Sequence, residues 1–173
     1  MSRTLVALLV PDAEPLVGDL RARLDPASKL GLGAHFTLLY PFHDTVEITP
    51  AHLASLREVG RRHAALAFSL ERVGAFPSTV WLAPDPDEAI IQLANELEAT
   101  FSGRPKVGRE FNAFVPHLSV ARNLRRAADR DAVVRTLEDR LAGGGVLCRC
   151  GELHLMARLE TGWRSVEMVS LAG

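Results

Sequence analysis

Apolar and polar positions follow two different spacings along the chain. Short, nearly continuous apolar runs bounded by Gly, Pro or polar residues predict buried strands, at residues 4–10, 35–40, 68–76, 79–83, 117–121, 146–159 and 163–171. Apolar residues that recur every three to four positions predict helices between these runs. One helix is capped by Asp12 and stops before Pro26, two span about residues 50–65 and 86–101, and a fourth buries Val133 and Leu137. In total we expect four helices and about eight strands.

Helices intermixed with hairpins in this way predict an α+β fold with antiparallel sheets. After about residue 86 the order of helix, loop and strand starts again, which indicates two similar lobes. The chain has 173 residues, of which 47% are apolar, so it can bury a sizeable core. We therefore expect residues 1–173 to form a single domain.

Charge excludes some classes of partner. The charged fraction is 24% and the formal net charge is -1, so no bulk attraction to nucleic acid or to a membrane is expected. The apolar run at residues 5–10 is too short for a signal peptide or a membrane span. We expect a cytoplasmic, monomeric protein that does not bind membranes. All basic residues except Lys29 and Lys106 are arginines, which suit local, bidentate binding of phosphate.

The only cysteines, Cys148 and Cys150, lie two positions apart on a predicted strand. Residues at this spacing are roughly 6.5 Å apart, a poor span for a disulfide. With His154 they form a C-x-C-x3-H pattern, which lacks a fourth zinc ligand nearby. We therefore expect reduced, structural cysteines and no metal site.

The candidate chemistry lies in a pattern of histidine, apolar residue and hydroxyl residue. It occurs twice inside predicted strands, as His35 with Thr37 and as His117 with Ser119, about half a chain apart. Successive side chains on a strand alternate faces, so each histidine shares a face with its hydroxyl residue. A third match, at His43, falls in a polar, loop-like stretch with no strand to align its side chains. The pairing of two such elements inside apolar strands indicates one shared site.

The sequence resembles the 2H phosphoesterases, and among them the 2',5' RNA ligase-like proteins, over nearly the whole chain. The resemblance is carried by residues 35–38 (His-Phe-Thr-Leu) with Tyr40-Pro41-Phe42, by Phe76 and Val80-Trp81-Leu82, and by residues 117–122 (His-Leu-Ser-Val-Ala-Arg) after Phe114 and Pro116. It implies two pseudo-symmetric lobes of antiparallel sheet with outer helices around a central cleft that both motifs face. Serine at 119 replaces the commoner threonine and keeps the hydroxyl.

The resemblance further implies a phosphodiesterase that opens 2',3'-cyclic phosphates to 2'-phosphates without a metal or other cofactor, and a related 2',5' RNA ligase activity. Its substrate would be an RNA end or a small nucleotide. By resemblance His117 is the general base and His35 the general acid, while Thr37 and Ser119 bind phosphoryl oxygens.

Three further residues are candidates for substrate binding. Arg122 could pair with phosphate if the strand bends there, although strict alternation points it away from His117. Trp81 could stack on a base if the hairpin borders the cleft, and burial in the core is the alternative. His43 follows the first motif closely enough to reach substrate, and a solvated loop histidine is the alternative.

Two other functions remain open at this point. A nucleotide- or RNA-binding module without turnover would keep the cleft, but it predicts an extended basic face that a net charge of -1 does not favour. A metal-dependent hydrolase would need carboxylates or cysteines beside the histidines, where this sequence has hydroxyls.

Overall fold

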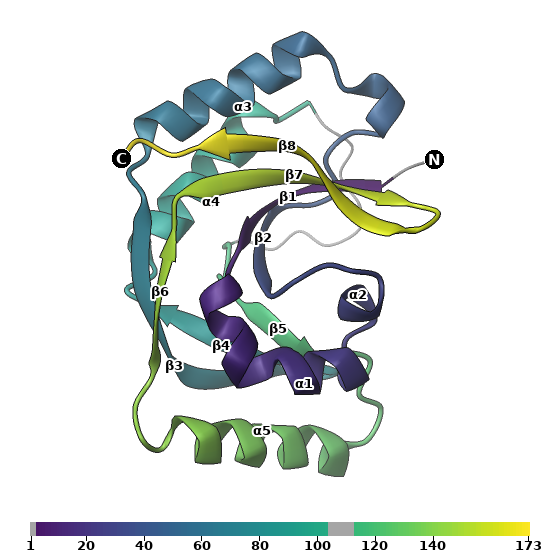
Figure 1. The fold of residues 1–173 in the computed structure, drawn as a ribbon, viewed down its shortest axis with the longest axis vertical. Coiled ribbons are helices and arrows are strands. Elements are labelled where there is room, and N and C mark those ends of the chain that lie inside the picture. The colour runs from purple at the N-terminus through teal and green to yellow at the C-terminus, as the bar shows by residue number, and fades with distance from the viewer. Residues whose placement is uncertain (1–2, 104–112) are drawn as a thin grey trace.

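One curled antiparallel sheet of eight strands, in the order β6-β3-β4-β5-β2-β1-β7-β8, organises the chain (Figure 1). The computed structural model describes residues 3–103 and 113–173. The strands are β1 (Arg3–Leu9), β2 (His35–Leu39), β3 (Leu66–Phe76), β4 (Thr79–Asp85), β5 (Leu118–Ala121), β6 (Val146–Cys150), β7 (Glu152–Leu159) and β8 (Gly162–Ser170). The structure confirms the α+β class.

The helices divide between the two ends of the sheet (Figure 1). They are α1 (Glu14–Leu24), α2 (Pro26–Lys29), α3 (Pro50–Arg62), α4 (Glu88–Thr100) and α5 (Ala127–Leu141), with 3-10 turns η1 (Pro11–Ala13) and η2 (Thr45–Glu47). Helix α3 contacts β8 and α4 contacts β2, whereas α1 contacts β5 and α5 contacts β3 and β4. We call the first group, with β1 and β7, the His35 lobe, and the second group, with β6, the His117 lobe.

The curl of the sheet follows from its apolar face. Phe36 on β2 and Phe68 on β3 are both buried, and their rings meet edge to face at 5.5 Å although β5 and β4 lie between their strands. Burying one such side chain contributes roughly 1.5–3 kcal/mol, so closing the sheet around these residues is favourable. The opposite face carries His35 and Thr37 of β2 and Ser119 of β5.

Two local predictions were wrong. Residues 146–159 do not form one strand, because the chain changes partner at Gly151, with β6 paired to β3 and β7 to β1. Asp12 does not cap α1, since η1 precedes that helix and the Asp12 carboxylate accepts a hydrogen bond from the backbone N–H of Arg149 at 3.0 Å. The apolar residues on both sides of Gly151 conceal the change of partner strand, and a residue suited to capping a helix can instead bond to a distant strand.

Pro26 ends α1 as predicted but also begins the short helix α2, which the sequence did not indicate. Asp25 caps α2 by accepting the N–H of Ala27 at 3.0 Å. Part of the loop expected after residue 101 lies outside the described residues. Within the ranges 3–103 and 113–173, no helix has the length and apolar character needed to cross a membrane.

Candidate functional site

The two motifs meet where the lobes join. Strands β2 and β5 are antiparallel and pair at Phe36 and Leu118. Continued by one residue each way, this register sets His35 opposite Ser119 and Thr37 opposite His117. Residues opposite each other share a face, so these four side chains lie together on the face away from Phe36. Diagonal neighbours in such a pair, as His35 and His117 are, lie roughly 7–8 Å apart, a distance that a phosphoryl group can span.

Both imidazoles are held in the same way. Nδ1 of His35 lies 2.8 Å from the carbonyl oxygen of Gly33, and Nδ1 of His117 lies 2.8 Å from that of Val115. A carbonyl oxygen only accepts hydrogen bonds, so Nδ1 carries the proton in each neutral ring. Each Nε2 is therefore the nitrogen with the free lone pair, able to take up or release a proton.

The surroundings of the two histidines differ. His35 is 9% exposed, and burial, together with the charges of Arg21 and Arg122, lowers its pKa to about 4. His117 is half-buried, and its pKa is also lowered, mainly by burial and further by Arg122. Both rings are therefore neutral at pH 7 in the free protein, and His35 binds a proton less readily than an ordinary histidine.

Aromatic rings border the site on the side of the His117 lobe. Trp81 on β4 lies opposite Ser119, and its ring centre is 6.0 Å from that of His117. Phe76, which is 38% exposed, lies 5.2 Å from His117 and 5.1 Å from Trp81. A Cβ at Gly74 would overlap the indole, so only glycine fits beneath it. The structure thus places Trp81 beside the motifs. It also places Phe76 there, a residue whose position at the end of a hairpin strand could have indicated this.

Arg122 lies within electrostatic reach of both motifs. It is exposed just after β5 ends, its N–H donates to the carbonyl oxygen of Leu24 at 3.0 Å, and Asn123 next to it has a left-handed φ of 60°. The chain therefore bends away from regular strand geometry here. The Arg122 charge lowers the pKa of both His35 and His117.

His43 lies apart from the motifs. Its ring stacks on that of His52, with centres 4.4 Å apart and planes at 13°, and its carbonyl oxygen accepts the hydroxyl of Thr4. His35 instead lies opposite Leu9, five residues further along β1, which corresponds to roughly 16 Å at strand rise. We therefore leave His43 out of the proposed site. His52 and His63 are half-buried, and His63 pairs with Glu96.

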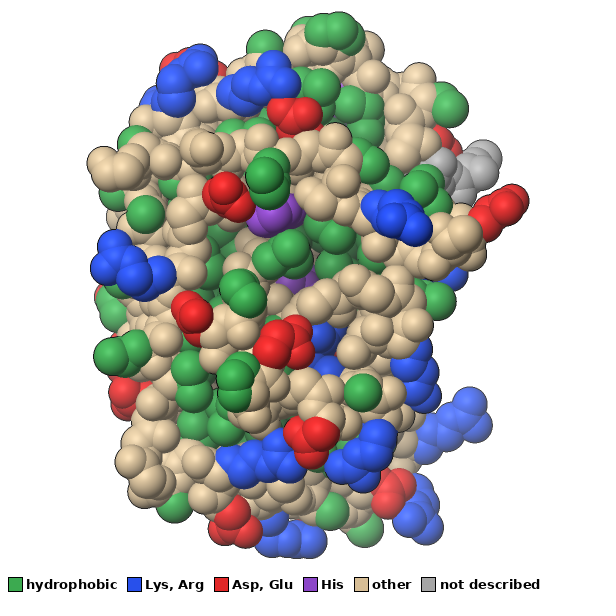
Figure 2. All heavy atoms as spheres, viewed as in Figure 1, with side chains coloured by type: hydrophobic (Ala, Val, Ile, Leu, Met, Phe, Trp, Pro, Cys, Tyr) green, Lys and Arg blue, Asp and Glu red, His purple; other side chains and the backbone are tan. Residues whose placement is uncertain are grey.

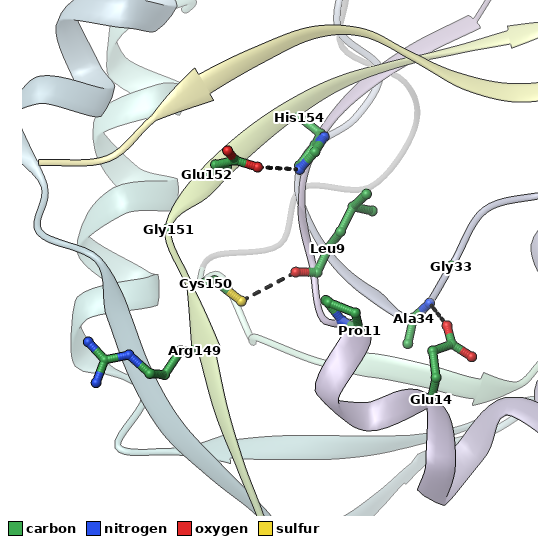
Figure 3. A pocket seen from close by; sticks show the side chains of 10 residues that line it. All are labelled: Leu9, Pro11, Glu14, Gly33, Ala34, Arg149, Cys150, Gly151, Glu152 and His154. Atoms are coloured by element: carbon green, nitrogen blue, oxygen red, sulfur yellow. Dashed lines mark hydrogen bonds and ion pairs between the residues drawn. The ribbon is translucent and has the colours of Figure 1, made fainter. Parts of the chain in front are cut away.

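A hollow of about 390 Å³ lies beside the His35 lobe, lined by Leu9, Pro11, Glu14, Gly33, Ala34, residues 149–152 and His154 (Figure 3). Figure 2 shows histidine in the middle of this face, with acidic and basic side chains around it. Ala7 lies opposite both Thr37 and His154, so His154 shares the motif face, two strands away. The hollow reaches the start of the first motif, and its lining does not include His35 or His117.

Both cysteines lie inside the fold. Cys148 and Cys150 are buried and free, and burial raises the pKa of the two thiols to about 11 and about 12. The Cys150 thiol donates to the carbonyl oxygen of Leu9 at 3.3 Å. In the described part of the chain, no three potential metal ligands of the His, Cys, Asp and Glu types come together.

Comparison with known proteins identifies the class. The chain belongs to the 2'-5' RNA ligase superfamily, whose family model matches residues 9–162. This confirms the resemblance to the 2H phosphoesterases and places the chain among phosphoesterase and RNA ligase-like proteins. No curated protein matches the chain in sequence.

Solved structures share the fold over almost the entire chain. Escherichia coli LigT in complex with 3'-AMP has a TM-score of 0.66 and 18% identity, covering 99% of both chains. A protein described as a phosphoesterase has a TM-score of 0.65 and 21% identity, again covering 99% of both chains. TT0787 of Thermus thermophilus has a TM-score of 0.64 and 18% identity, covering 99% of this chain and 98% of its own.

Proposed function

We propose that the protein is a metal-independent phosphodiesterase that opens 2',3'-cyclic phosphates of RNA ends or nucleotides to 2'-phosphates. The observation that supports this most is the β2–β5 pairing, with its two Nδ1 atoms anchored on carbonyl oxygens, which makes Nε2 the basic nitrogen of each ring. Two such nitrogens, set across a phosphoryl-sized gap with a hydroxyl beside each, match what hydrolysis of a strained phosphodiester requires.

In the proposed reaction His117 Nε2 takes a proton from water, and the water oxygen attacks phosphorus. The bond between phosphorus and the ribose 3' oxygen breaks, and His35 Nε2 protonates that oxygen. The products are a 2'-phosphate and a free 3'-hydroxyl. Thr37 and Ser119 donate hydrogen bonds to the non-bridging oxygens. Each histidine would contribute roughly 10²- to 10⁴-fold.

The acid needs a proton that His35 lacks in the free protein at pH 7. A phosphodiester anion about 4 Å from the ring would supply roughly 4 kcal/mol at an effective dielectric constant near 20, or about 3 pKa units. That attraction is large enough to bring the pKa of His35 back to about neutrality. The substrate anion would thus help to protonate His35, and it would raise the pKa of His117 as well. The assignment of His117 as the base and His35 as the acid rests on the family resemblance.

The same groups could catalyse a ligation. With a 5'-hydroxyl in place of water, His117 would deprotonate that hydroxyl, and opening the cyclic phosphate would leave a 2',5' linkage. Arg122 would bind the phosphate, and Trp81 with Phe76 would contact a base. The complex of E. coli LigT with 3'-AMP supports a nucleotide as substrate class.

The test is incubation with nucleoside 2',3'-cyclic phosphates, a cyclic-phosphate-ended oligoribonucleotide and a 2',5'-linked dinucleotide, each with and without chelator. We expect 2'-phosphate products, identified by phosphorus NMR, at a rate that the chelator leaves unchanged. Loss of turnover that added zinc restores would establish metal dependence instead. Tight binding of all substrates without turnover would establish a binding module.

A further inference from the structure

The ladder between β2 and β5 consists of a single residue pair. Strands β2 and β5 pair at Phe36 and Leu118, and the neighbouring carbonyl oxygen of Ser119 is bonded by a side chain from α1. Arg21 Nε donates to Ser119 at 3.3 Å, and Arg21 Nη2 donates to the carbonyl oxygen of Leu32 at 2.9 Å. The guanidinium thus bridges the two motif segments where the sheet does not.

This bridge is part of a buried charged network. Arg21 is 1% exposed and Asp25 is fully buried, and Arg21 Nη2 donates to Asp25 Oδ2 at 2.9 Å. Glu14 Oε1 lies 3.6 Å from Arg21 Nη1 and accepts the N–H of Ala34 at 2.6 Å. The backbone just before His35 is therefore held on both sides, at Leu32 and at Ala34.

Stability alone does not account for such a network. Burying an ion pair costs several kcal/mol in lost hydration for each ion, and well-packed apolar residues often serve folding equally well. A guanidinium differs from an apolar group in its planar set of five donors, which can fix several acceptors at once. Here the acceptors are one carboxylate and two carbonyl oxygens, one from each motif segment.

We propose that Arg21, locked by Asp25, is a positioning residue that fixes the first motif relative to the second and so sets the distance between the two histidines. The inference rests on the proposed function, because that distance matters only if both rings act on one phosphate. Arg21 acts through the backbone of Leu32 and Ser119 and does not contact the reacting atoms in this role.

The charges around His35 provide an independent readout. Besides burial, Arg21 from α1 and Arg122 after β5 lower the pKa of His35, and Asp25 at the end of α1 raises it. Replacing Arg21 by a neutral residue would remove one cation and leave the Asp25 carboxylate without its partner. Replacing it by lysine would keep the charge and remove the planar set of donors.

The experiment compares Arg21→Lys and Arg21→Gln with a matched control, Arg140→Lys. Arg140 also bonds a carbonyl oxygen and a carboxylate, those of Leu16 and Asp19, each at 2.7 Å, but it joins α5 to α1 and these acceptors lie outside both motif segments. For Arg21→Lys we expect kcat to fall about 10-fold or more with KM changed less than about threefold, since a shift of about 1 Å can cost 10²-fold. Arg140→Lys should keep wild-type kcat. Wild-type kcat in Arg21→Lys would overturn the proposal.

Imidazole NMR separates positioning from folding and from the proposed function. In wild type and in Arg21→Lys the pKa of His35 should stay low, whereas in Arg21→Gln it should rise. The Nδ1–H signals of His35 and His117 should shift or broaden in both Arg21 variants and stay unchanged in Arg140→Lys. Unchanged signals would overturn the proposal even if no substrate were turned over. If Arg21→Gln does not fold, Asp25→Asn replaces it, and there the pKa of His35 should fall, because the carboxylate that raises it is lost while Arg21 keeps its charge. A wild-type protein that hydrolyses nothing would refute only the proposed function.

Discussion

The two halves of the site share a motif and differ in their surroundings. Each half has a histidine whose Nδ1 is bonded to a carbonyl oxygen two residues earlier, at 2.8 Å in both cases. His35 is buried against the network of Arg21 and Asp25, whereas His117 is half-buried between the rings of Phe76 and Trp81. The repeated motif supplies the geometry, and the residues packed around each histidine supply the asymmetry.

Such an asymmetry is what acid–base chemistry needs from two identical groups. Equal imidazoles in equal environments would protonate together, while unequal environments separate their proton affinities. The buried charges act on the protonation of His35, and under the proposed function the aromatic rings beside His117 would contact the substrate. The comparison therefore predicts that variants in the two halves fail in different ways.

The largest effect should come from the histidines. His35→Ala and His117→Ala should each lower kcat by about 10²-fold or more, because each removes a proton-transfer group. The double variant should lose less than the product of the two, since both act in one proton-transfer cycle. Steady-state kinetics on a nucleoside 2',3'-cyclic phosphate measure this.

His43→Ala is the control for the histidine variants. His43 is followed by any residue and a hydroxyl residue, as His35 and His117 are, but its ring stacks on that of His52. Its kcat should stay near wild type. A loss as large as that of His35→Ala would show that the first motif had been assigned to the wrong histidine.

The hydroxyl residues should have the next largest effect, and it should be similar in the two halves. Thr37→Ala and Ser119→Ala each remove one hydrogen bond to a charged oxygen, worth roughly 1.5–3 kcal/mol, or about 10- to 100-fold in kcat/KM. Thr37→Ser and Ser119→Thr keep the hydroxyl and should retain most activity. Unequal losses in the two alanine variants would show that the phosphate sits closer to one lobe.

Much of the fold and the site followed from local patterns. The alternation of faces around Phe36 and Leu118 was sufficient to predict that each histidine shares a face with its hydroxyl residue, and the structure brings the two pairs together. The sequence could not indicate the role of Arg21. The chain has many arginines, and nothing in the local pattern of the first helix shows that the acceptors of this one are the carbonyl oxygens of Leu32 and Ser119. Contacts between segments distant in sequence depend on the tertiary arrangement, which local periodicity does not encode.

The burial of His35 predicts a pH dependence of stability that His117 shares only weakly. The pKa of His35 is about 4 when folded and near 6.5 when unfolded, so between these values the unfolded chain binds more protons. The contribution of the neutral His35 ring to the free energy of unfolding is therefore fully present above about pH 6.5 and is lost as the pH falls toward 4. The loss is about 2 kcal/mol at pH 5.

Denaturant unfolding at pH 7.5 and pH 5 measures this effect. Because all other groups titrate alike in both proteins, the difference between wild type and His35→Gln isolates the contribution of His35. The variant should lose less stability than wild type between the two pH values, and His117→Gln should change the dependence less. Equal pH dependence in wild type and His35→Gln would show that His35 is not buried in a neutral state.

The smallest effect should come from the aromatic rings, and it should depend on the substrate. Trp81→Leu and Phe76→Leu should raise KM for a nucleoside 2',3'-cyclic phosphate about fivefold, because stacking on a base is worth roughly 1–3 kcal/mol and these rings are only partly exposed. Gly74→Ala should act like Trp81→Leu, since its Cβ would displace the indole. Ribose 2',3'-cyclic phosphate, which has no base, should show the same KM in all four proteins. If its KM rose in parallel, the rings would support His117 itself and not a base, and the aromatic half of the site would be structural.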